Sequence, residues 1–138
     1  MKKILPLALI LPVLFACALP AAAPTEASAP AESAPPFLGM WMNDTETYVF
    51  TANSLYHVII RPESGQVNEE FSEIVAYDAA ASRITLRKTW IRVNGKPAGF
   101  DAPLYTFIYS ASGDSLQLGL GTETEFATEL DPAVFTRK

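Results

Sequence analysis

The feature that most constrains the fold is a series of short runs rich in Tyr, Phe, Val, Ile and Thr, separated by turn signals such as VNGK and ASGD. No stretch has apolar residues at positions i, i+3, i+4 and i+7 for long enough to indicate a substantial helix. Runs of this kind with short links pair antiparallel with their neighbours in sequence. The pattern therefore predicts an all-β, up-and-down meander of about eight strands: 46–51, 55–61, 67–78, 83–93, 96–101, 104–110, 115–120 and 133–137.

The two longest runs are predicted to pair through a loop at residues 79–82. In this register apolar residues face apolar residues and acids face bases, whereas a slip of one residue would exchange the two faces. Glu73 and Lys88 then lie on the otherwise apolar face, either as a half-solvated cross-strand contact or as a pair that orients the polar group of a ligand. The predicted pairs are Tyr77/Ile84, Val75/Leu86, Glu73/Lys88, Phe71/Trp90 and Glu69/Arg92.

A second hairpin, with its loop at residues 111–114, is predicted to place aromatic residues opposite leucines on one face. The pairs are Tyr109/Leu116, Phe107/Leu118 and Tyr105/Leu120. Each hairpin thus has one apolar face, and the chain offers no helix to cover it. Closure of the meander into a small barrel would cover both faces and leave no exposed sheet edge.

The segment FLGMW, residues 37–41, leads into the first strand of this meander. Its Gly39 and Trp41 resemble the Gly-x-Trp signature of the lipocalin superfamily, whose Trp closes the barrel floor beneath an Arg from near the final strand. The resemblance implies that Arg137 takes this position, in a cation–π contact with Trp41. The alternative is that Trp41 is an ordinary core aromatic and Arg137 a solvated terminal charge. The family's Thr-Asp-Tyr motif has no counterpart here, and the domain is shorter than typical lipocalins.

Residues 1–16 have the pattern of an export signal, with two lysines followed by an apolar run at 4–15. This run of about 12 residues is too short to span a bilayer. The motif LFAC at residues 14–17 resembles the lipobox of bacterial lipoproteins, which implies that Cys17 is lipidated and becomes the N-terminus. Two alternatives remain: ordinary secretion with cleavage after residues 16–18 or 21–23, or Cys17 as an apolar residue of the signal.

Residues 17–36 are predicted to be a tether, because 18–36 contain five Pro, eight Ala and no aromatic residue. The folded domain is therefore residues 37–138. Cys17 is the only cysteine, so this domain has no internal disulfide. A lipidated Cys17 would hold the protein on the cell envelope, and Ala18 after it resembles the pattern of lipoproteins sent to the outer membrane.

The charge of the exported chain is strongly acidic. Without the two signal lysines, 8 basic residues stand against 15 acidic residues, a net charge of −7. Nucleic acid is therefore a poor candidate partner, since binding it normally needs a basic face. An anionic membrane would also repel the domain, which leaves the lipid as the membrane attachment and a basic protein as a possible partner.

The residues that carry catalysis are scarce. His57 is the only histidine, and a lone histidine on a strand is more often a surface or hydrogen-bonded polar residue than a ligand or base. The sequence has no nucleophile elbow, no glycine-rich phosphate loop and no set of ligands for zinc. We expect no enzymatic activity, no cofactor and no metal site.

Two functions remain open on these observations. The first is an envelope lipoprotein whose barrel binds a small apolar or amphipathic ligand. The alternative is a tethered protein-binding module (an inhibitor, assembly factor or adhesin component) with a solid barrel and functional loops. A cavity of less than ~300 Å³ would exclude the first. The candidate ligand-lining residues are Tyr48, Phe50, Phe71, Glu73, Lys88, Trp90, Tyr105, Phe107 and Tyr109.

Overall fold

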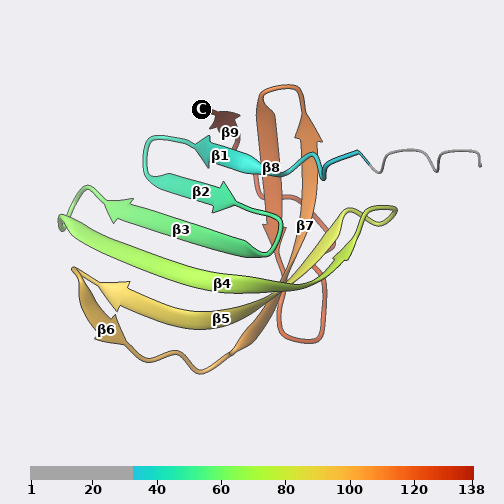
Figure 1. The fold of residues 1–138 in the computed structure, drawn as a ribbon. Helices are drawn as coiled ribbons and strands as arrows, with labels where there is room; N and C mark the ends of the chain where they lie inside the picture. The colour runs from blue at the N-terminus through green and yellow to red at the C-terminus, as the bar shows by residue number, and fades with distance from the viewer. Residues whose placement is uncertain (1–32) are drawn as a thin grey trace, which may run out of the picture. The chain divides into compact units, whose positions relative to one another are not determined.

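The computed structural model describes residues 33–138, so the predicted export signal, Cys17 and most of the predicted tether lie outside the described residues. This part of the chain folds into one antiparallel sheet (Figure 1) and contains no helix. No segment of residues 33–138 therefore forms a helix long and apolar enough to cross a membrane. The strands are β1 (Gly39–Met42), β2 (Glu46–Phe50), β3 (Ser54–Arg61), β4 (Gln66–Asp78), β5 (Arg83–Val93), β6 (Lys96–Ala98), β7 (Leu104–Ser112), β8 (Ser115–Leu120) and β9 (Phe135–Arg137).

The sheet closes on itself into a barrel. Its strand order is β4-β3-β2-β1-β9-β8-β7-β5-β6, and an additional pairing of β4 with β5 joins the two sides. The short strand β6 pairs with β5 alone and lies outside the closed ring of eight strands. The prediction of an all-β meander that closes into a small barrel is confirmed.

The register of β4 with β5 is as predicted near both ends but differs in the middle. The pairs Tyr77/Ile84, Phe71/Trp90 and Glu69/Arg92 are observed. Between them the register shifts twice, between Phe71 and Ser72 and again between Ile74 and Ala76. Each shift leaves one residue without a partner, so the two shifts compensate and restore the original pairing.

These shifts overturn two of the predicted pairs. Glu73 pairs with Arg87 instead of Lys88, and Lys88 pairs with Ser72. Leu86 pairs with Ile74 instead of Val75. Because side chains alternate between the faces of a strand, the shifts turn Ser72 inward, where it is fully buried, and turn Glu73 outward, where it is exposed. The pairing on each side of the shifts is as predicted, but from Glu69 to Glu73 the inward and outward positions of β4 are the reverse of those predicted.

The hairpin of β7 and β8 is tighter than predicted. Its loop has two residues, Gly113 and Asp114, and Gly113 adopts a φ of 58°, as the first central residue of a type II′ turn does. Tyr109 therefore pairs with Leu118 instead of Leu116. A shift of two positions keeps each side chain on its own face, so the aromatic residues of β7 point into the barrel as predicted.

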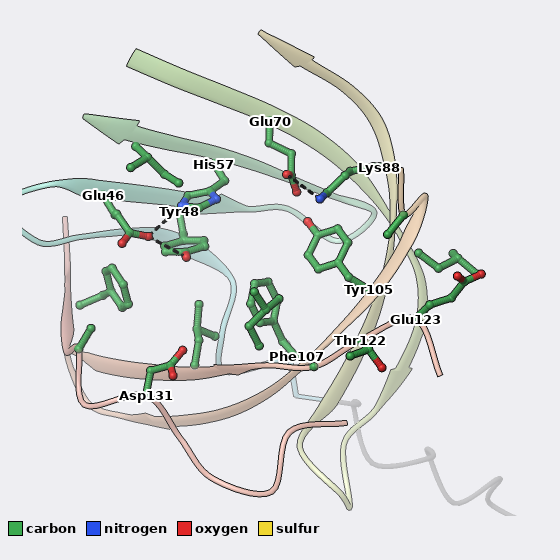
Figure 2. Close-up of a pocket in the computed structure, with 18 residues that line it drawn as sticks. Glu46, Tyr48, His57, Glu70, Lys88, Tyr105, Phe107, Thr122, Glu123 and Asp131 are labelled. Atoms are coloured by element: carbon green, nitrogen blue, oxygen red, sulfur yellow. Dashed lines mark hydrogen bonds and ion pairs between the residues drawn. The ribbon is translucent and has the colours of Figure 1, made fainter. Parts of the chain in front are cut away.

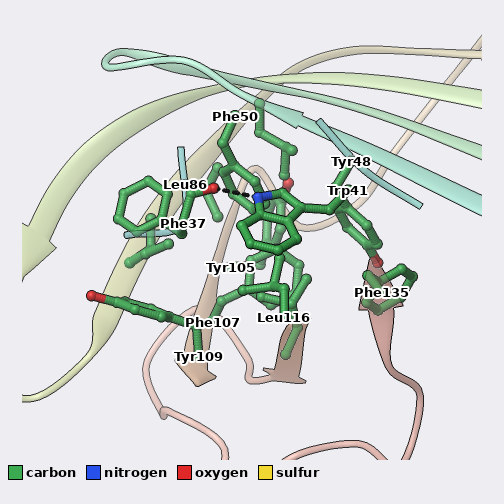
Figure 3. Packing of buried hydrophobic residues seen from close by; sticks show 13 residues of the cluster. Phe37, Trp41, Tyr48, Phe50, Leu86, Tyr105, Phe107, Tyr109, Leu116 and Phe135 are labelled. Atoms are coloured by element: carbon green, nitrogen blue, oxygen red, sulfur yellow. Dashed lines mark hydrogen bonds between the residues drawn. The ribbon is translucent and has the colours of Figure 1, made fainter. Parts of the chain in front are cut away.

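The core fills one end of the barrel and extends toward its middle (Figure 3). At the filled end Phe37 packs edge-on against Phe50 and Tyr109, with ring centroids 5.3 and 5.2 Å away. Trp41 and Leu55 are completely buried beside them. The whole buried cluster and the whole closed sheet belong to residues 33–138, which form one compact unit. Because every strand described in this unit pairs within it and its buried residues form one cluster, we expect the unit to fold on its own.

Candidate functional site

A cavity of about 560 Å³ occupies the end of the barrel opposite the packed core (Figure 2). Residues of β2, β3, β4, β5, β7 and β8 line it, together with the segment between β8 and β9 and the start of β9. Its volume falls within the range of small-molecule sites, ~300–1,000 Å³.

Aromatic rings form the inner part of this cavity. Tyr48 from β2 packs edge-on against Phe135 from β9, with ring centroids 4.9 Å apart. On the other side, Tyr105 and Phe107 from β7 make a second edge-to-face pair, with ring centroids 5.5 Å apart. All four side chains are buried, so their packing gives the cavity a rigid apolar surface.

The first polar group on the cavity wall consists of Glu46, Tyr48 and His57. Residues 46 and 48 lie two apart on β2 and therefore share its inward face, and His57 lies directly opposite Tyr48 on β3. The Tyr48 hydroxyl donates to Oε2 of Glu46 at 2.9 Å, and Nε2 of His57 lies 3.0 Å from the same oxygen. The imidazole also stacks on the Tyr48 ring, with centroids 4.0 Å apart.

The pKa values of this group follow from these contacts. The hydrogen bond from His57, and then that from Tyr48, hold the pKa of Glu46 below its usual range despite its partial burial. Glu46 is therefore ionised at neutral pH, and since a carboxylate only accepts hydrogen bonds, Nε2 of His57 carries the proton. Burial, reinforced by the nearby Glu46 carboxylate, raises the pKa of Tyr48, which keeps its hydroxyl a donor.

The second polar group joins β4, β5 and β7. Nζ of Lys88 lies 3.4 Å from Oε2 of Glu70 and 5.0 Å from the centroid of the Tyr105 ring. The Tyr105 hydroxyl donates to Oγ of Ser72 at 2.9 Å, and Ser72 in turn donates to Oε1 of Glu70 at 3.2 Å. Burial and the Glu70 charge raise the pKa of Tyr105. Each polar atom of this group that is buried thus has a partner.

Gly39, Trp41 and Arg137, the residues of the lipocalin-like signature, lie at the filled end of the barrel. The Arg137 guanidinium lies 4.2 Å from the centroid of the Trp41 ring, the position that the lipocalin resemblance implies. Arg137 also donates to the carbonyls of Leu38 and Pro36, at 3.0 and 3.2 Å. Gly39 has a φ of 119°, and a β-carbon there would approach Nη1 of Arg137 to 3.1 Å. A residue with a side chain is therefore strained at position 39 and crowds the arginine.

The indole nitrogen of Trp41 is also satisfied. Nε1 donates to the carbonyl of Phe37 at 2.7 Å, the bond drawn in Figure 3. With its ring completely buried and covered by the guanidinium, Trp41 closes this end of the barrel. Arg137 thus covers the indole and is held by two carbonyls, as the resemblance implies, while 38 % of its side chain remains exposed.

The predicted ligand-lining residues separate into three groups. Tyr48, Lys88, Tyr105 and Phe107 line the cavity. Phe50 and Tyr109 are buried in the packed core and do not line it.

Phe71, Glu73 and Trp90 are on the outer face of the barrel, which corrects their predicted position. Phe71 and Trp90 stack on each other there, with ring centroids 6.0 Å apart, and Arg92 lies over the Trp90 ring. The register shifts beside Ser72 are the physical reason, since they exchange the inward and outward positions of β4 and β5 in this region. These residues therefore cannot contact a molecule in the cavity.

The sequence prediction missed Glu46 and Glu70 as wall residues. The signal for Glu46 was present, since it shares a strand face with Tyr48 and Phe50. Glu70 had no such signal, because it faces inward only as a result of the register shift. His57 is a hydrogen-bonded polar residue, as expected, but it also lines the cavity.

Residues 33–138 contain no group of three His, Cys, Asp or Glu side chains placed to hold a metal ion. No protein-family model, curated protein or solved structure matches the chain. The function must therefore be argued from the cavity and its wall.

Proposed function

We propose that this barrel binds a small amphipathic molecule in its cavity. The observation that carries the proposal is a cavity of about 560 Å³ whose inner surface is aromatic and whose wall carries two hydrogen-bonded polar groups. A pocket with an apolar body and a few fixed polar groups suits a ligand with the same division.

The cavity also favours this function over the alternative of a solid barrel that acts through its loops. A barrel of this size could have been filled by large side chains at every inward position. Here the inward residues at one end are polar or small, among them Glu46, Glu70 and Ala133. Their side chains leave the volume that a ligand would take.

The proposal includes the cellular context predicted from residues 1–36. We infer that the chain is exported and held on the envelope through acylated Cys17, as a lipoprotein, in the outer membrane if the cell has two. The closed barrel and the Arg137–Trp41 contact support a relationship to lipocalins. No catalytic step is part of this function.

Native mass spectrometry of residues 33–138, purified from a bacterial host without denaturation, tests the ligand-binding function. We expect a bound molecule of a few hundred daltons that is released on unfolding. Ala133→Trp, which places an indole in the cavity, should abolish the added mass, whereas Ala81→Trp, in the exposed turn between β4 and β5, should retain it.

An unliganded mass alone would not separate an empty cavity from a closed one, so the same samples are then titrated with a fluorescent apolar dye. Dye binding that Ala133→Trp abolishes supports the proposal. Absence of both the added mass and the dye signal would contradict it.

A further inference from the structure

The cavity wall carries an excess of negative charge. Four carboxylates line it, those of Glu46, Glu70, Glu123 and Asp131, against one ammonium, that of Lys88 (Figure 2). Protonation of His57 would leave the acids in excess. Charges beside a cavity with apolar walls act through a lower effective dielectric constant than charges in water. The excess of negative charge therefore favours a positively charged ligand over a negatively charged one.

Lys88 is already engaged and offers little to an anion. Its ammonium lies 3.4 Å from Glu70 and over the Tyr105 ring, and both contacts stabilise the charge. An anionic head group would have to compete with Glu70 for this single cation. It would also approach the remaining carboxylates, which repel it.

Glu46 is the best placed of the acids to receive a cation. Both of its hydrogen bonds, from Tyr48 and from His57, end on Oε2, and Oε1 accepts none from residues 33–138. Its side chain is 29 % exposed, so the carboxylate is reachable yet partly desolvated. Tyr48 and His57 hold it in place, as the orienting groups of a binding carboxylate do.

The other two acids extend the same field. Neither Glu123 nor Asp131 has a cation within ion-pair distance among residues 33–138. Both belong to the segment between β8 and β9 that lines the cavity, and both are exposed. Attraction from these residues is screened by salt, whereas attraction from Glu46 is screened less.

We propose that the ligand is an amphipathic cation, with an alkyl or aromatic body among the rings of Tyr48, Phe107 and Phe135 and an amine or quaternary ammonium group at the carboxylates. The aromatic surfaces add to the preference, because the faces of such rings attract cations that have lost part of their hydration. This inference rests on the proposed ligand-binding function and names its ligand class.

Isothermal titration calorimetry with three probes of equal chain length tests the charge preference directly. The probes are decyltrimethylammonium, decanol and decanoate, added to residues 33–138 at neutral pH; the two ions stay below their micelle concentrations and decanol below its solubility limit. We expect the cation to bind at least tenfold more tightly than the anion, with the alcohol between them. Added salt should reduce the affinity for the cation and leave that for the alcohol unchanged.

Two variants and one control test whether the preference for a cation comes from the carboxylates of the cavity wall. Glu46→Gln should weaken cation binding several-fold without changing decanol binding, and the exposed pair Glu123→Gln and Asp131→Asn should do so to a smaller extent. Glu73→Gln removes one acid from the outer face of the same barrel and should leave the binding of all three probes unchanged. The exposed pair keeps the test valid if Glu46→Gln fails to fold.

The outcomes separate the inference from the function on which it rests. If all three probes bind equally, or decanoate binds most tightly, the barrel binds ligands but the preference for a cation is wrong. If Glu73→Gln weakens cation binding as much as Glu46→Gln does, the preference comes from overall charge and the assigned wall is wrong. If no probe binds, the ligand-binding function itself is overturned.

Discussion

Replacing Arg137 with alanine tests whether the contact with Trp41 holds the barrel closed. The change removes the guanidinium 4.2 Å above the buried indole and the two hydrogen bonds to the carbonyls of Leu38 and Pro36. These contacts join the last strand to the segment that enters the first one. Their loss should therefore weaken the joint at which the sheet closes.

The expected cost follows from the exposure of the arginine. Its side chain is 38 % exposed, so the cation–π contact contributes about 0.5–1 kcal/mol. The two hydrogen bonds end on exposed carbonyls that water can satisfy after the change, so each contributes about 0.5–1 kcal/mol. Together they predict a loss of about 1.5–3 kcal/mol, which lowers the urea midpoint by about 1–2 M for a domain of this size.

Urea unfolding of residues 33–138, followed by tryptophan fluorescence, measures this loss. A Trp90→Phe background leaves Trp41 as the only tryptophan, so the signal reports the floor of the barrel. Arg92→Ala, measured in the chain that retains Trp90, is the matched control. Arg92 lies 4.6 Å over the Trp90 ring on the outer face, and no hydrogen bond from its side chain to residues 33–138 is present.

We expect Arg92→Ala to cost less than about 1 kcal/mol, since only an exposed cation–π contact is lost. Arg137→Lys should be intermediate, because the ammonium retains the charge but cannot stack and donate to both carbonyls at once. If Arg137→Ala costs no more than Arg92→Ala, the arginine does not hold the floor and our reasoning about the signature is refuted.

Three further changes test other parts of the structure. Gly121→Ala should lower the thermal midpoint, because its β-carbon would lie 2.3 Å from the carbonyl oxygen of Glu125; an unchanged midpoint would contradict this close packing. Ser72→Ala should cost about 1–3 kcal/mol in urea, since the buried hydroxyl of Tyr105 loses its acceptor, and the cost should shrink in a Tyr105→Phe background. Because folding lowers the pKa of Glu46, this carboxylate is protonated at a higher pH in the unfolded chain than in the folded one. Its contribution to the free energy of unfolding is therefore fully present above pH 4.5, the unfolded value, and is lost as the pH decreases through the folded pKa. Glu46→Gln should therefore flatten the acid side of the stability profile, and an unchanged profile would be evidence against the His57 contact.

Most of the sheet could be predicted from the sequence because strand alternation is a local property. The aromatic residues of β7 face inward whether its hairpin loop has two residues or four, since a shift of two positions does not change the face. The pairs near both ends of β4 and β5 were predicted for the same reason. Part of the cavity wall, including Tyr48 and Tyr105, follows from this alternation alone.

The remaining part of the wall could not be predicted in this way. A hairpin without register shifts places Phe71 and Glu73 inward and leaves Glu70 outward, whereas the structure has the reverse. Both arrangements pair apolar with apolar residues at the ends of the hairpin. The local pattern therefore does not distinguish them.

By itself, the sequence determined that this chain forms an antiparallel meander with one apolar face. The contact of Arg137 with Trp41 was only implied by a resemblance, with an alternative open, until the structure placed the two side chains together. Only the tertiary structure decided where β4 and β5 shift register, and hence that Ser72, Glu70 and Lys88 share the interior. The physical reason is that a closed barrel must bend its long strands, and the bend occurs where β3 and β7 pack against them from either side. The place of a bulge thus depends on neighbours distant in sequence, and the chemistry of the cavity depends on the bulge.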